Sequence, residues 1–167
     1  MSSRGVWYGI AAVVIIAIAG YGLYAYFTAP TSTTTPPPPS GNGGGNVNTQ
    51  NITLFGGEVS ASVYGWGLTK STLKSPGPTL NLTVGTPVHI SMTVVGSIPH
   101  AFAIYSTNSV SSSVLFNSEI GTASNPLISG ETKSVTFTPT EAGTFYYICP
   151  VPGHSDLGMW GEVKVTQ

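Results

Sequence analysis

Apolar and polar side chains alternate along four short stretches of the later part of the chain, residues 80–84, 88–94, 135–138 and 163–166. Successive side chains of a β-strand point to opposite faces of its sheet, so a period of two indicates a strand with one buried and one exposed face. We therefore expect half-buried β-strands at these four places.

Two further stretches, residues 101–105 and 144–149, are apolar almost throughout. Short runs of this kind, rich in aromatic and β-branched residues, are typical of strands that are buried more completely. Proline and glycine interrupt the chain between the predicted strands, as at residues 75–78. The stretch 106–130 is mostly Ser, Asn and Thr, so we expect loops there, with one short strand at residues 114–116.

No helical period extends beyond two turns in this part of the chain. About seven or eight short strands separated by turns predict an all-β fold, either a β-sandwich or a β-barrel.

Residues 6–27 form an uninterrupted apolar segment without a charged side chain. At about 1.5 Å per residue, a helix of this length crosses a hydrocarbon core of about 30 Å, so we expect a transmembrane anchor within residues 1–27. A cleaved signal peptide is the alternative, but the apolar segment is longer than the usual h-region and ends without a good cleavage site. Arg4 precedes the segment, which favours a cytoplasmic N-terminus and an extracytoplasmic C-terminal domain.

Residues 28–50 have the composition of a linker. They include a Thr-rich run, four consecutive prolines at 36–39 and a Gly-rich run at 41–45. Proline runs favour extended polyproline II structure and glycine runs favour flexible coil, and neither supplies side chains for a core. We therefore expect an anchor over residues 1–27, a linker over 28–50 and one folded domain over 51–167.

The charge of the chain argues against nucleic acids as partners. Charged residues make up 7% of the 167 residues and the net charge is −1. Nucleic-acid binding requires a cluster of basic side chains to replace phosphate counterions. The five basic residues are instead scattered along the chain: Arg4, Lys70, Lys74, Lys133 and Lys164.

One loop between two predicted strands holds a thiol, an imidazole and a thioether, in Cys149, His154 and Met159. The chain has a single cysteine, so Cys149 cannot form an internal disulfide, and metal ligation is a way to hold such a thiol outside the cytoplasm. Copper that cycles between Cu(I) and Cu(II) suits a plane of two imidazoles and one thiolate with a weak axial thioether. The loop lacks one imidazole of this set.

His100 is the candidate for the missing ligand. It follows Pro99 and opens the apolar stretch 101–105, so it ties a distant part of the fold to the loop. His89 is the rival, but it shares the polar face of its strand with Ser91 and Thr93 and is interpreted as a solvent-facing residue.

The pattern His100…Cys149-x4-His154-x4-Met159 resembles the cupredoxins, the type 1 blue copper proteins, and its loop spacing is most similar to sulfocyanin and rusticyanin. The resemblance implies an eight-stranded Greek-key β-sandwich with one copper ion held near one end by these four side chains. Many cupredoxins have Asn or Ser directly after the first histidine, where it ties the two ligand loops together. This chain has Ala101, so the tie must come from elsewhere or be absent.

These residues indicate an electron carrier rather than an enzyme. Multicopper enzymes pass electrons to a second copper centre that needs further histidines, whereas this chain has three histidines in all and Pro150 follows Cys149. We expect single-electron transfer between extracytoplasmic respiratory partners, towards a terminal oxidase, with docking on apolar surface near His154 and Leu157. Trp160 either belongs to this surface or packs in the core at the start of the last strand. Copper storage or delivery, and a subunit II-like role in an oxidase complex, are the alternatives.

Overall fold

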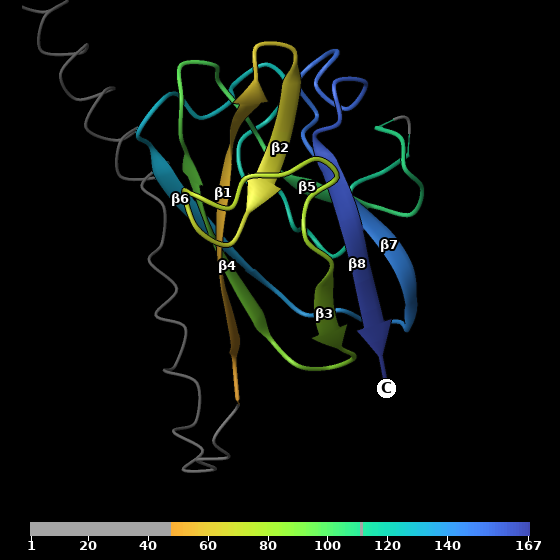
Figure 1. The fold of residues 1–167 in the computed structure, drawn as a ribbon. Coiled ribbons are helices and arrows are strands. Elements are labelled where there is room, and N and C mark those ends of the chain that lie inside the picture. The colour runs from red at the N-terminus through yellow and green to blue at the C-terminus, as the bar shows by residue number, and fades with distance from the viewer. Residues whose placement is uncertain (1–47, 111) are drawn as a thin grey trace, which may run out of the picture. The chain divides into compact units, whose positions relative to one another are not determined.

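The computed structural model describes residues 48–110 and 112–167, which form two four-stranded β-sheets packed as a sandwich (Figure 1). In chain order the strands are β1 (Gln50–Ser60), β2 (Val63–Gly67), β3 (Leu80–Thr83), β4 (Val88–Val94), β5 (Ala103–Tyr105), β6 (Thr132–Phe137), β7 (Gly143–Ile148) and β8 (Trp160–Thr166). The first sheet has the order β2-β1-β4-β6 and the second β3-β8-β7-β5. The expected all-β sandwich is confirmed.

The expected anchor over residues 1–27 and the expected linker up to residue 47 lie outside the described residues. Within residues 48–110 and 112–167, no helix is long and apolar enough to cross a membrane. The first element of this part is β1, which begins at Gln50.

Strand β4 shows how the alternating sequence produces two faces. Its apolar residues Val88, Ile90, Met92 and Val94 are buried, and the polar residues between them are half-buried. The strand lies between β6, which is antiparallel to it, and β1, which is parallel. In the second sheet β8 likewise pairs antiparallel with β7 and parallel with β3. Parallel strands cannot be joined by tight hairpins, so the chain crosses between the sheets and brings sequence-distant loops to the same end.

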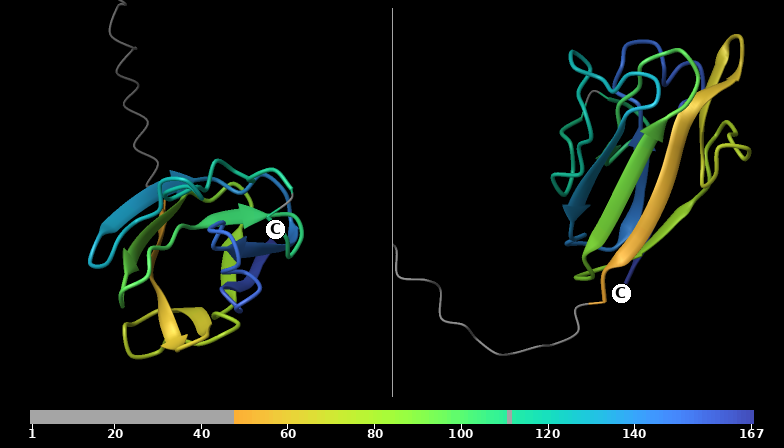
Figure 2. Two further views of the ribbon diagram at one scale, coloured as in Figure 1. Left: turned by 90° about the horizontal axis from the view of Figure 1, so that it is seen from above. Right: turned by 90° about the vertical axis from the view of Figure 1, so that its left-hand side faces the viewer.

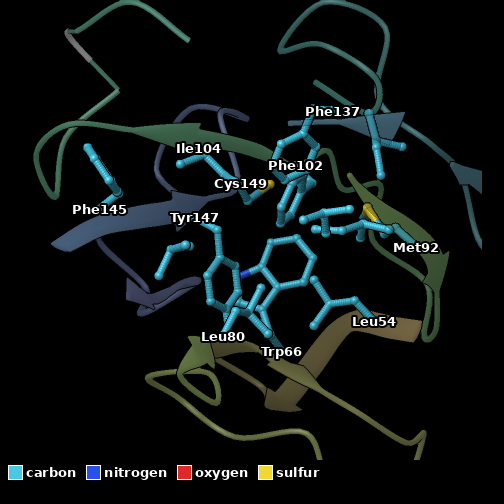
Figure 3. Close-up of a cluster of buried hydrophobic side chains, with 14 of the residues drawn as sticks. Leu54, Trp66, Leu80, Met92, Phe102, Ile104, Phe137, Phe145, Tyr147 and Cys149 are labelled. Carbon is cyan, nitrogen blue, oxygen red and sulfur yellow. The ribbon is translucent and has the colours of Figure 1, made fainter. Parts of the chain in front are cut away.

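The core fills the space between the two sheets, whose strands surround a common interior when viewed from above (Figure 2). Its largest fully buried side chains include Trp66, Tyr147 and Phe102, whose rings contact one another with centroids 5.7–5.9 Å apart. Cys149 belongs to the same cluster (Figure 3). The thiol is therefore built into the hydrophobic core.

The stretch after β5 differs from the sequence-based expectation. The strand expected at residues 114–116 is absent, and Phe116 and Asn117 instead form a left-handed turn with φ values of 57° and 55°. A strand cannot continue through two such residues, so the chain reverses there. It then reaches the core through isolated bridges, one of which joins Phe102 to Ile120. The strand expected at 101–105 is also shorter, because regular pairing with β7 begins at Ala103.

The loop between β7 and β8, residues 149–159, lies at one end of the sandwich, together with the β1–β2 turn and the connection between β4 and β5 (Figures 1 and 2). The start of β1 and the C-terminus lie at the other end. All the sequence-predicted ligands therefore belong to elements of one end.

Candidate metal centre

His100 is held by backbone hydrogen bonds in the connection between β4 and β5. Its amide donates to the carbonyl of Leu127 at 3.0 Å, and its own carbonyl accepts from the Leu127 amide at 2.8 Å. The side chain is fully buried. Residue 100 is therefore fixed on both sides of its backbone before any metal binds.

Cys149 and Met159 are the first and last residues of the second ligand loop, and a backbone hydrogen bond joins them. The Cys149 amide donates to the Met159 carbonyl at 3.1 Å, and the Met159 amide donates to the His154 carbonyl at 3.0 Å. Gly153 and Gly158 adopt φ values of 82° and 90°, which glycine reaches without a steric penalty. These turns fold the loop back, so that its three candidate ligands face the same end of the core.

Three donor atoms from the two loops converge. Nδ1 of His100 lies 3.1 Å from Nδ1 of His154, and Sγ of Cys149 lies 3.5 Å from the same His154 nitrogen. The donor atoms of all three residues lie within 4.8 Å of one another, and all three residues are buried. One soft thiolate and two imidazoles suit the trigonal plane of a type 1 copper site. The residues present therefore fit a single copper ion.

Met159, the predicted axial ligand, is fully buried at the end of the same loop. It belongs to the core cluster that contains Cys149, and its methyl group would lie 3.0 Å from a Cβ added at Gly56. The thioether thus lies in the same core cluster as Cys149, where an axial ligand of the copper site is expected. Its bond to the metal remains a prediction.

Burial controls the protonation of the ligands in the metal-free protein. It lowers the pKa of His100 to about 4, an effect that the neighbouring His154 reinforces, and it also lowers the pKa of His154. Both imidazoles are therefore neutral near pH 7, with a lone pair available for a metal. Burial raises the pKa of the Cys149 thiol to about 11, although amide hydrogen bonds from Ala101 and Val151 oppose the rise. A bound cation would supply the positive charge that stabilises the buried thiolate and so favours loss of the thiol proton.

The tie between the ligand loops comes from the backbone. The Ala101 amide donates to Sγ of Cys149 at 3.4 Å. A backbone amide does not depend on the side chain it carries, so the absence of Asn or Ser at this position does not separate the loops.

His89 lies away from this cluster, as expected. It is half-buried on β4, where its Nδ1 is 2.9 Å from Oγ1 of Thr136 on the neighbouring strand β6. Trp160 begins β8 but packs beside the small cluster of Ala103, Tyr105 and Ile148 rather than in the main core. Trp160 thus begins the last strand and packs against a core cluster, as one of the two expectations has it, while its side chain stays half-buried.

Sequence reasoning missed Tyr64 on β2, which covers both imidazoles. Its ring centroid lies 4.6 Å from that of His154 and 5.5 Å from that of His100. The Tyr64 amide also donates to the carbonyl of Leu157 at 3.0 Å, so β2 is attached to the ligand loop. No spacing in the sequence relates this tyrosine to the histidines.

Comparison with known proteins agrees with this donor set. Residues 78–166 match the copper binding proteins of the plastocyanin/azurin family. Over 45 residues the chain is 54% identical to auracyanin-A of Chloroflexus aurantiacus, covering 26% of this chain and 27% of that protein. Over 30 residues it is 53% identical to rusticyanin of Acidithiobacillus ferrooxidans, covering 18% of this chain and 16% of that protein. These matches thus span about a quarter or less of each relative.

Solved structures show the same fold. Rusticyanin from Thiobacillus ferrooxidans superposes with a TM-score of 0.51 at 22% identity, covering 71% of this chain and 80% of that one. The multicopper oxidase mgLAC superposes with a TM-score of 0.54 at 22% identity, covering 70% of this chain and 38% of that one. With its buried His-Cys-His cluster and the match over residues 78–166, this chain belongs to the plastocyanin/azurin family of copper binding proteins.

Proposed function

We propose that this protein is a membrane-anchored, mononuclear type 1 copper protein that transfers single electrons between extracytoplasmic redox partners. The observation that supports it most directly is the convergence of His100, Cys149 and His154 donors within 4.8 Å in a buried site. A copper ion bound there supplies reversible one-electron chemistry.

The arrangement of the ligands suits electron transfer better than catalysis on a substrate. His100 and Cys149 are fully buried and His154 is 8% exposed. Backbone hydrogen bonds hold each of these residues in place without a metal. A site whose ligands move little between oxidation states needs little reorganisation, and the burial of these three residues limits the access of a substrate to the metal.

His154 is the ligand nearest to solvent, so we propose it as the route of the electron. The same loop carries the exposed Leu157, three residues further along the chain. An apolar side chain beside the ligand allows a partner to approach closely without burying unpaired charge. The partner, in this proposal, is a membrane-bound redox complex such as a terminal oxidase.

The proposed anchor is the apolar segment of residues 6–27, with the copper domain on the extracytoplasmic side. Membrane fractionation of the full chain and of a variant lacking residues 1–27 tests this point. Recovery of both in the soluble fraction would contradict the anchor without touching the copper site.

Optical and EPR spectra of the copper-loaded full chain test the electron carrier directly. We expect an intense thiolate-to-copper(II) absorption in the visible range, a narrow type 1 EPR hyperfine splitting, and loss of both in Cys149→Ser. The copper should then be reduced and reoxidised rapidly by small redox reagents. A colourless Cu(I) protein that releases its metal readily to a chelator would instead indicate copper storage or delivery, and purification in a fixed ratio with oxidase subunits would indicate a subunit II-like role.

A further inference from the structure

The β1–β2 hairpin, defined here as residues 55–67, contacts both ligand loops. Glu58 on β1 is the cross-strand partner of Tyr64 on β2, so the two side chains leave the same face of the hairpin. Tyr64 packs against the imidazoles and its amide binds the loop that carries His154. Glu58 binds the other loop, the one that leads to His100.

The Glu58 carboxylate holds that other loop through hydrogen bonds. Its Oε1 accepts three hydrogen bonds: from the Ser97 amide at 2.9 Å, from the Ser97 hydroxyl at 2.9 Å and from the Ile98 amide at 3.2 Å. These residues stand two and three places before His100 in the chain. The Glu58 side chain thus binds three polar groups of the segment that leads to His100, the first copper ligand.

The backbone around the carboxylate leaves space for it. Gly96 has a φ of 89°, and a Cβ at this position would overlap Oε2 of Glu58. A Cβ at Gly57 would similarly overlap the carbonyl of Val95. Oε2 is buried, with no hydrogen-bond partner among the described residues. The loop therefore closes over the carboxylate, and both glycines permit the close approach.

We infer that Glu58 is a positioning residue of the copper site, which holds residues 97–98 so that the imidazole of His100 is presented to Cys149 and His154. The inference rests on the copper site proposed above. Glu58 acts through hydrogen bonds to Ser97 and Ile98 and does not touch the metal. Removing a group outside the ligand set that orients a ligand usually lowers metal affinity 10- to 100-fold.

The test compares Glu58→Ala, Glu58→Gln and the exposed control Glu141→Gln in the full chain. The Gln side chain keeps an oxygen that accepts the three hydrogen bonds but lacks the charge, whereas Ala lacks both. We expect Glu58→Ala to lower Cu(II) affinity at least tenfold, measured by competition with a chelator, and to change the copper hyperfine splitting in EPR. Glu58→Gln should keep near-native affinity and EPR spectrum, and Glu141→Gln should match the wild type.

The reduction potential separates the two roles of the carboxylate. A negative charge near the site stabilises Cu(II), so both Glu58 variants should have a higher potential than the wild type. Only Glu58→Ala should also lose affinity. Ser97→Ala removes one of the three hydrogen bonds on an exposed residue, and it should lower the affinity by less than Glu58→Ala does. This variant serves as the second probe if Glu58→Ala does not fold.

Equal affinities in the wild type, Glu58→Ala and Ser97→Ala, or equal losses in Glu58→Ala and Glu58→Gln, would overturn the positioning role. A lower unfolding midpoint of metal-free Glu58→Ala with unchanged EPR and affinity would also overturn it, since it would show a purely structural residue. The wild type provides the independent check. If it gives no type 1 spectrum, the proposed function fails, whereas a type 1 spectrum with unaffected variants removes only the inference about Glu58.

Discussion

The backbone amide of Ala101 donates a hydrogen bond to Sγ of Cys149 at 3.4 Å, which joins the two loops that carry the copper ligands. Both residues are fully buried. An amide that points at a thiolate withdraws negative charge from sulfur, so the bond tunes the electronics of the ligand as well as its position. It also opposes the rise that burial causes in the thiol pKa.

Replacing the Ala101 amide with an ester, by incorporating lactic acid at position 101, removes this donor and keeps the side chain. We expect a lower reduction potential and a shifted thiolate-to-copper absorption, because the sulfur then donates more charge to the metal. Potentiometry and optical spectroscopy measure both. Ala101→Gly retains the amide and is the matched control. Identical potentials in the ester and glycine variants would show that the bond has no electronic role.

Met159→Leu tests the axial position. Leucine has nearly the volume of methionine, so the fold should lose less than about 1.5 kcal/mol, while the thioether donor is removed. We expect the type 1 spectrum to persist and the reduction potential to rise, because a weaker axial ligand favours Cu(I).

Met92 on β4 provides the control for this substitution, since it is equally buried but belongs to a strand that carries no candidate ligand. Met92→Leu should leave the potential unchanged. A rise of the same size in both variants would assign the effect to general repacking and would remove Met159 from the ligand set.

Leu157→Lys tests the docking surface near His154. Leu157 is 38% exposed on the ligand loop, and a charge there should weaken association with an apolar partner surface and slow bimolecular electron transfer. Stopped-flow kinetics with a purified oxidase or cytochrome measures the rate. Leu68→Lys is the control. Leu68 is also exposed, at 50%, but it lines a pocket with the start of β1, which lies at the end of the sandwich opposite the ligand loop (Figure 1). Unchanged rates in Leu157→Lys with every partner would place docking elsewhere.

Tyr147→Phe tests the hydrogen bond of a fully buried core tyrosine. The Tyr147 hydroxyl donates to the carbonyl of Pro78 at 2.6 Å, and burial raises the pKa of this phenol. Removing the hydroxyl leaves the carbonyl without its partner, so we expect a loss of about 1–2 kcal/mol in the free energy of unfolding. Urea denaturation measures it. Tyr146→Phe changes the half-buried ring of the preceding residue and should cost less.

Glu58 makes stability depend on pH. Burial acts to raise its pKa, but hydrogen bonds from Ser97 and Ile98 outweigh burial, so the pKa lies below its ordinary value of 4.5. A carboxyl group with a depressed folded-state pKa stabilises the fold above its unfolded pKa and loses that contribution as the pH falls through the folded value.

The stability advantage of the metal-free wild type over Glu58→Gln should therefore be full near pH 7 and shrink below pH 4.5. Urea midpoints across this interval measure it, with Glu141→Gln as the control. A constant difference between the wild type and Glu58→Gln at all pH values would contradict the expected linkage.

Strands with alternating side chains were the easiest part of the fold to predict. Residues 88–94 and 163–166 carry a period of two that burial against a core imposes, and they are β4 and most of β8. The β1–β2 hairpin escaped prediction because glycine replaces apolar side chains at Gly56, Gly57, Gly65 and Gly67. These glycines admit close neighbours: the ring of Trp66 at Gly56 and backbone carbonyls at the other three. Such packing leaves no periodic pattern in the sequence.

The candidate ligands could be predicted from the sequence because three of them share one loop. Their thiol, imidazole and thioether donors already favour copper over other metals. The chain order of Cys149, His154 and Met159, with an upstream Pro-His pair, is a local property of the sequence. Their spatial convergence with His100 and their protonation depend on burial, which requires the complete sandwich. Glu58 and Tyr64 had no such local pattern. They meet the ligand loops across 39 and 93 positions of chain, as in Glu58–Ser97 and Tyr64–Leu157, and only the packing of the hairpin against both loops determines those contacts.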